Sequence, residues 1–221
     1  MNISCIFKIS LLNSLEICYT KNTNLKGVQK MKKRILCAIL AVVMVVALAA
    51  CGTAPKDDAS KVTIESPVAL LDGVWSTFAE EEKFPVMGGN NYETPVDDGA
   101  GEFDISDVEA ATATLHITED SLKLVDKVGT ITHAMNANTF SAAAYHLADA
   151  ANAETLVNSL KDSIKSTQWM CGFPDTLIIY TVAENYVVAA FGNAEAIENF
   201  KTKLATVYGE SATLNVEESL A

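Results

Sequence analysis

The residues best suited to chemistry lie between Gln168 and Pro174 (QWMCGFP), where a tryptophan stands two residues before a thiol. A cysteine in such a setting suggests thiol chemistry. Cys171 has no second cysteine two residues further on, and it is expected after a helix and before a strand. The favoured interpretation is a turn in which Trp169, Cys171 and Phe173 pack beneath a sheet. Thiol chemistry at Cys171 is the alternative.

His133 is the second candidate, because an imidazole could act as the base for Cys171 or join Met135 and Met170 in a soft-metal site. The order and spacing of these residues match no catalytic triad and no metal-ligand motif. We therefore expect a hydrogen-bonded histidine at the end of a helix. No metal ion and no cofactor are predicted, and catalytic residues are not assigned.

Acidic residues gather in a glycine-containing loop, at Asp97, Asp98, Glu102 and Asp104. A calcium loop needs alternating oxygen ligands and a closing bidentate glutamate. The spacing here does not match an EF-hand, so a solvated acidic loop is expected.

Amides beside aromatic side chains suit the recognition of sugars or peptides. A hypothetical binding face is formed by Asn136, Asn138, Phe140, Tyr145 and Trp169. This face requires a fold that brings residue 169 next to the segment 136–145.

Charge excludes one class of partner. Residues 1–50 carry seven basic residues and one acidic residue, so residues 51–221 carry nine lysines against 27 acidic residues, a net charge of −18. The only arginine, Arg34, is in the first part. A surface with this charge and no guanidinium group repels phosphate, so nucleic-acid binding is not expected.

A targeting segment gives the strongest signal in the sequence. The basic cluster Lys32-Lys33-Arg34 precedes sixteen apolar residues at 35–50, which predicts a signal peptide over residues 31–50. The run is shorter than the roughly 20 residues of a comfortable bilayer span. Its ending, Leu48-Ala49-Ala50-Cys51, resembles the bacterial lipobox. The resemblance implies cleavage between Ala50 and Cys51 and attachment of diacylglycerol to the Cys51 thiol; an uncleaved anchor is the alternative.

Residues 1–30 precede this signal. They are interpreted as an upstream extension that results from an incorrectly assigned start codon, with translation beginning at Met31. Removal of residues 1–50 also removes three cysteines. With Cys51 lipidated, Cys171 is then the only thiol, and an intrachain disulfide is excluded.

The rest of the chain is expected to have a simple organisation. Its parts are a lipidated N-terminus and flexible tether over residues 51–66, a single α+β domain over residues 67–209 and a polar C-terminal tail over residues 210–221. Capping residues and apolar periodicity predict helices at 67–78, 106–115, 122–135, 152–164 and 193–207. A strand is predicted at 139–147, with a helix as the alternative because the segment contains three alanines. Two further strands are predicted at 176–183 and 186–191, and they form a hairpin.

These elements predict an α+β fold with an α-helical N-terminal part. The sheet is expected to be small, antiparallel or mixed, and three-stranded, with helices packed on one face. The strands at 139–147 and 176–183 are expected to be parallel, because a helix connects them.

Four segments resemble one family of small lipoproteins from clostridial-type bacteria. They are HAMNANTF from His133, QWMCGFPDTLIIYTV from Gln168, AAFGN at 189–193 and EEKFPVMGG at 81–89. The resemblance implies an envelope location and a shared fold. Some members carry the label bacteriocin transport accessory protein, a name otherwise attached to thioredoxin-like proteins. Since this chain lacks the second cysteine, the resemblance supplies no catalytic residues.

The sequence thus predicts a lipid-anchored protein on the extracytoplasmic face of the cell membrane. We expect a non-enzymatic binding or accessory module for an extracellular ligand or envelope protein. The alternatives are a structural envelope protein that self-associates and a thiol-based redox accessory protein that uses Cys171.

Overall fold

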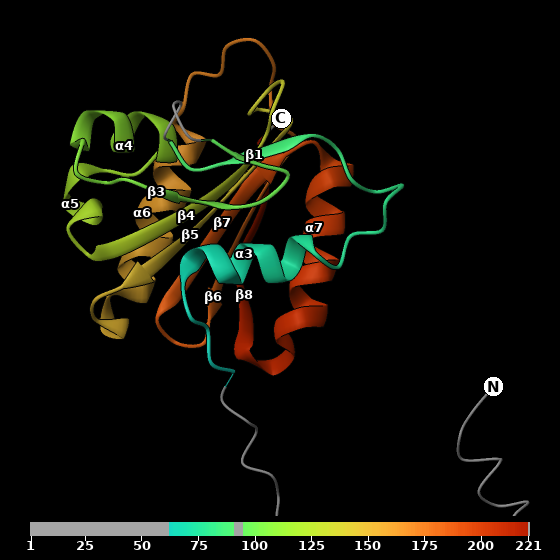
Figure 1. Ribbon diagram of the computed structural model, residues 1–221. Helices are drawn as coiled ribbons and strands as arrows, with labels where there is room; N and C mark the ends of the chain where they lie inside the picture. The colour runs from blue at the N-terminus through green and yellow to red at the C-terminus, as the bar shows by residue number, and fades with distance from the viewer. Residues whose placement is uncertain (1–61, 91–94, 221) are drawn as a thin grey trace, which may run out of the picture. The chain divides into compact units, whose positions relative to one another are not determined.

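The computed structural model describes residues 62–90 and 95–220, which form an eight-stranded antiparallel sheet and five α-helices (Figure 1). The strands are β1 (Val86–Gly88), β2 (Val96–Asp97), β3 (Gly101–Phe103), β4 (Val125–His133), β5 (Phe140–Leu147), β6 (Thr176–Val182), β7 (Tyr186–Gly192) and β8 (Ala212–Ser219). The helices are α3 (Pro67–Trp75), α4 (Val108–Leu115), α5 (Glu119–Leu122), α6 (Ala153–Lys165) and α7 (Ala194–Tyr208).

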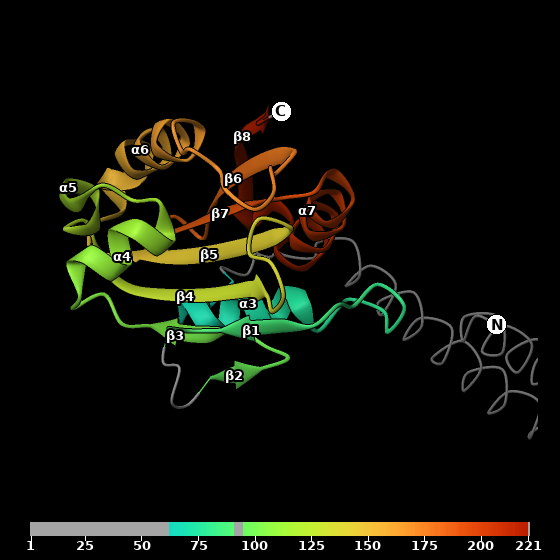
Figure 2. The same ribbon diagram turned by 90° about the horizontal axis from the view of Figure 1, so that it is seen from above.

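The sheet has helices on both faces and is ordered β2-β1-β4-β5-β7-β6-β8, with β3 on the same edge of β4 as β1. Helices α3 and α7 contribute to the core on one face, and α4, α5 and α6 contribute to the core on the other (Figure 2). The prediction of a small three-stranded sheet with helices on one face is therefore wrong. The strands that were not predicted lie in segments that we expected to be a loop, a helix and a polar tail.

Strand β4 accounts for the largest error, because residues 122–135 were predicted to be a helix. Val125, Val128 and Thr132 do recur at helical spacing, but the segment pairs with β5 over nearly its whole length. Gly129 permits a close approach here, since a Cβ atom at this position would lie 2.8 Å from the backbone nitrogen of Val68 in α3. The glycine that weakened the predicted helix thus lets α3 pack on the strand.

The predicted hairpin of β6 and β7 is confirmed. Strand β7 also pairs antiparallel with β5, so it lies between β5 and β6. Strands β5 and β6 therefore run in the same direction, as predicted, but they are not neighbours.

Residues assigned to a polar C-terminal tail include strand β8, which pairs with β6 along its length. Lysines on the helices hold its acidic side chains: Lys201 of α7 is 2.7 Å from Glu217, and Lys165 of α6 forms an ion pair with Glu218. The backbone ladder to β6 holds β8 at the edge of the sheet, and these ion pairs add to it, although only Val216 of the strand is buried.

Several predicted helix starts are confirmed. The Ser66 side chain accepts a hydrogen bond from Ala69 N at the start of α3, and Asn193 accepts one from Ala196 N at the start of α7. Helix α4 is capped by Asp107 rather than by the predicted Ser106.

All described residues belong to one compact unit, and both hydrophobic cores lie within it. This unit therefore contains the buried surface that a domain needs to fold by itself. No helix in the described part of the chain has the length and apolar character of a membrane span. Cys51, the predicted signal peptide and the upstream extension lie outside the described residues.

Candidate functional site

A hollow of about 100 Å³ opens on the α4–α6 face, over the middle of the sheet. Small side chains on neighbouring strands form its floor: Thr130 of β4 is paired with Ala143 of β5, which is paired with Ala189 of β7. Ala143 lies in a central strand covered on both faces of the sheet, yet it is only half-buried. The hollow therefore exists because these side chains are too short to reach the helices above them.

The walls come from separate parts of the chain. The C-terminal end of α4 contributes Leu115 and His116, α6 contributes Ile164, and the connection between β4 and β5 contributes Asn138. A hollow of this volume has room for several water molecules. A side chain or a small functional group fits in this space.

His116 is the titratable group of the hollow, and burial holds its pKa below the usual range. Its Nδ1 atom lies 3.1 Å from Thr167 Oγ1, and the Thr167 hydroxyl donates to Ser163 O at 3.1 Å. Because a hydroxyl has one proton, Nδ1 must be the donor to Thr167 in the neutral ring. This leaves Nε2 as a hydrogen-bond acceptor with no protein partner among the described residues.

Aromatic rings fix the position of His116. Its ring centroid lies 5.1 Å from that of Trp169 and 5.4 Å from that of Phe191. The backbone of His116 has φ of 50°, in the left-handed region, where it ends helix α4.

Hydroxyl groups supply the other polar atoms of the lining. Ser141 Oγ donates to Ala137 O at 3.0 Å and lies 3.5 Å from Thr132 Oγ1. Among the described residues that line the hollow there is no Asp, Glu, Lys or Arg. A hollow with hydroxyls, a neutral imidazole and methyl groups suits an uncharged ligand group that has both polar and apolar atoms.

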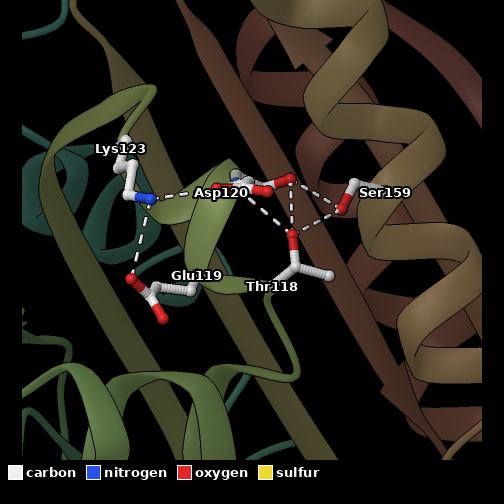
Figure 3. A network of polar contacts seen from close by, with 6 residues as sticks. Thr118, Glu119, Asp120, Lys123 and Ser159 are labelled. Atoms are coloured by element: carbon white, nitrogen blue, oxygen red, sulfur yellow. Dashed lines mark hydrogen bonds and ion pairs between the residues drawn. The ribbon is translucent and has the colours of Figure 1, made fainter.

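Helices α5 and α6 are joined by a hydroxyl network (Figure 3). Ser121 Oγ donates to Ser159 Oγ at 2.6 Å, and Thr118 Oγ1 donates to Ser121 Oγ at 2.9 Å. Lys123 lies 2.9 Å from Asp120 on the outer side of α5. The network ties the short helix α5 to α6, which carries the Ile164 wall.

Two asparagines connect the β4–β5 loop to the loop before β6. Asn138 Nδ2 donates to Met170 O at 2.8 Å and to Gly172 O at 3.0 Å. Asn136 Nδ2 donates to Cys171 O at 3.0 Å. These amides hold the backbone of residues 170–172 beside the hollow.

Large apolar side chains project from the two joined loops. Met135 is 83% exposed, Met170 is 80% exposed and Phe173 is 77% exposed; we call these three residues the apolar rim. Cys171 is also exposed and has φ of 63°. The prediction that Cys171 and Phe173 pack beneath the sheet is therefore wrong, whereas Trp169 is half-buried against the core.

The hypothetical thiol pair is not assembled. His133 ends strand β4 rather than a helix, and its Nδ1 atom accepts from Met135 N at 3.1 Å and Asn136 N at 3.3 Å. Among the described residues no hydrogen bond joins His133 to Cys171. The histidine orders the loop that carries Asn136.

The hypothetical binding face is divided by the sheet. Asn136, Asn138 and Trp169 lie at the two loops, and Tyr145 lines the hollow. Phe140 is fully buried in the core on the opposite face. The sequence analysis did not identify the floor residues or His116. Small residues at alternate positions of the predicted 139–147 strand could have indicated a hollow over that strand.

Two polar groups outside the hollow already have hydrogen-bond partners. His146 is hydrogen-bonded on both sides, by Asp126 at 2.5 Å and by Asn185 at 2.7 Å. In residues 62–90 and 95–220 no group of three His, Cys, Asp or Glu side chains is placed to hold a metal ion. The acids predicted to lie in one loop do not all do so, because Asp97 is in β2 and Glu102 is in β3. Asp104, after β3, accepts the Ser106 N–H, which lowers the pKa of its carboxyl group.

Comparison of the chain with family models, with curated proteins and with solved structures finds no match.

Proposed function

We propose that the protein is a lipoprotein held on the extracytoplasmic face of the membrane through Cys51. In this proposal the domain is a non-enzymatic binding module, and its ligand places a small uncharged group in the hollow. The observation that carries the proposal is an uncharged, partly polar hollow in a chain segment whose net charge is −18.

Binding is tested with matched small probes on the chain from Gly52 onward. Acetamide and acetate have nearly the same shape, but only acetamide is uncharged and carries both a donor and an acceptor. We expect millimolar acetamide to shift the NMR signals of Ala143 and Ala189, and equal concentrations of acetate to leave them in place. Equal shifts with both probes, or none with either, would refute the proposed site.

Anchoring is tested separately with the full chain. Wild-type protein is expected in the membrane fraction of the expressing bacterium, and mass spectrometry should find acyl chains on residue 51. Cys51→Ala should abolish the lipid modification. An unmodified Cys51 in membrane-bound wild-type protein would contradict the anchor and favour the uncleaved signal sequence.

A further inference from the structure

We infer that the group bound in the hollow is an amide, whose N–H donates to His116 Nε2 and whose carbonyl oxygen accepts the hydroxyl proton of Thr130. This inference rests on the proposed function and names the chemical class of its ligand. It depends on two polar side chains of the lining, each of which has hydrogen-bonding capacity that the described residues do not use.

His116 supplies the acceptor. Its Nδ1 atom is bonded to Thr167, which is not among the described residues that line the hollow, so this edge of the ring is already occupied. Nε2 has no partner, yet the described part of the chain contains no side-chain nitrogen or oxygen that is both buried and unpartnered. Nε2 must therefore be accessible, and we place it at the wall that His116 forms. A bare ring nitrogen there attracts an N–H or O–H group and disfavours a carboxylate.

Thr130 supplies the donor. The residue is on the floor of the hollow and is only 6% exposed. Its Oγ1 atom accepts a hydrogen bond from Gly89 N at 3.0 Å. The hydroxyl proton itself has no acceptor within residues 62–90 and 95–220, although a buried hydroxyl can donate as well as accept. A carbonyl oxygen in the hollow would satisfy this proton.

The position of the two groups favours an amide over an alcohol. His116 ends a helix in the wall, and Thr130 is on a strand of the floor, so they reach a ligand from different sides. An amide has its donor and its acceptor on separate atoms, whereas an alcohol has both on one oxygen. The methyl groups of Ala143 and Ala189 on the floor suit the apolar part of a small amide.

Thr167 is the positioning residue for the acceptor. Its hydroxyl donates to Ser163 O and accepts from His116 Nδ1, so it keeps the ring in the tautomer that leaves Nε2 bare. Thr167→Val should release this constraint, and nitrogen NMR spectroscopy of the ring should then show protonated Nε2. Thr167→Ser keeps the hydroxyl and should retain the wild-type tautomer. A merely structural role for Thr167 would leave the tautomer the same in both variants.

The experiment compares acetamide, acetone and isopropanol on the chain from Gly52 onward, through the methyl signals of Ala143 and Ala189. The three probes are uncharged and have nearly the same shape, but acetone has no donor and isopropanol has its donor and acceptor on one atom. We expect acetone and isopropanol to bind about tenfold more weakly than acetamide, because each leaves a polar group of the hollow unpaired. Ala144, in the core on the opposite face, is the internal control and should not respond.

Two further measurements follow the individual bonds. Thr130→Val lacks the hydroxyl and should bind acetamide about tenfold more weakly, whereas Thr130→Ser keeps it and should bind like the wild type. In the wild type, acetamide should move the His116 Nε2 signal toward that of a hydrogen-bonded ring nitrogen. This last measurement needs no variant.

The source of the amide is distinguished with N-methylacetamide. Binding as strong as that of acetamide would support a peptide bond or an acetylamino group as the bound amide. Much weaker binding, with acetamide still bound, would support a primary carboxamide.

Equal binding of acetamide and acetone, or of acetamide and isopropanol, would overturn the amide assignment. An Nε2 signal that acetamide leaves in place would do the same. If acetate has no effect in these cases, the proposed binding function stands and only the amide assignment fails. If acetamide and acetate act alike, the proposed site itself fails.

Discussion

The side-chain amide of Asn138 donates to the carbonyl oxygen of Met170 at 2.8 Å, and so joins two loops whose residues are 32 positions apart in the chain. The same amide also donates to Gly172 O. Through these bonds a residue of the hollow wall holds the backbone of the loop that carries Met170 and Phe173. Asn136 adds a third bond between the same two loops, to Cys171 O.

Replacing Asn138 should loosen the loop before β6. Asn138→Ala removes the donors of two hydrogen bonds, one exposed and one partly buried, which should lower the free energy of unfolding by about 1–2 kcal/mol. Asn138→Asp should be at least as harmful despite its similar shape, because a carboxylate offers the carbonyls no N–H group. Hydrogen exchange of residues 169–174 should become faster in both variants. A matched Asn136→Ala variant loses one bond to this loop and the bond that Asn136 Oδ1 accepts from Asn138 N, and its effect on the exchange of residues 169–174 should be the smaller; unchanged exchange in all three variants would refute the coupling.

A larger side chain in the hollow should not destabilise the domain, whereas a larger side chain in the core on the opposite face of the sheet should. Ala143→Leu places new atoms in open space, so the free energy of unfolding should be unchanged or should rise by about 0.5–2 kcal/mol. Ala144 is fully buried in the α3–α7 core, and Ala144→Leu should cost about 1–3 kcal/mol through overpacking. Denaturant unfolding of both variants measures the difference. Equal losses at the two positions would mean that the hollow is closed in solution.

The contact between α5 and α6 can be measured as a coupling energy. Ser121→Ala and Ser159→Ala each break the 2.6 Å hydroxyl bond, so the double variant should lose less stability than the sum of the two single losses. A coupling of about 0.5–1.5 kcal/mol is expected for a hydrogen bond of this kind. Additive losses would show that the bond does not contribute.

Stability should fall in mild acid partly because of His116. Burial lowers its folded-state pKa, so the folded state favours the neutral ring. The stabilisation is therefore present above the unfolded-state pKa of about 6.5 and is lost as the pH falls through the lower, folded-state pKa. Asn tolerates the left-handed backbone at this position, so His116→Asn should fold and show a shallower loss of stability below pH 6.5. Parallel pH profiles for the two proteins would contradict this assignment.

Local signals in the sequence identify many of the elements but not the size of the sheet. Ser66 and Asn193 cap helices because capping depends on a few neighbouring residues, and the β6–β7 hairpin is likewise local. Strand β8 has a single buried residue, Val216, so its sequence resembles a polar tail. Its pairing with β6 and the ion pairs of Lys165 and Lys201 become visible only in the folded chain.

The candidate site could be predicted only in part for the same reason. Asn136 and Asn138 stand in a distinctive local sequence, but their partners are more than 30 residues away. The hollow depends on which small residues face each other across β4, β5 and β7, and this register follows from the β4 strand that the sequence analysis missed. Phe140 was assigned to the surface because alternation alone does not reveal that both faces of the sheet are covered.

The most direct test of the account is an acetamide titration of the wild-type domain and of Ala143→Leu, followed through the methyl signal of Ala189. Ala189 is paired with Ala143 and lies on the same floor. We expect a saturable shift of the Ala189 signal in the wild type, no shift with acetate, and loss of the response when leucine fills the hollow. A response of equal size in Ala143→Leu would contradict the central claim, because the probe would then bind elsewhere.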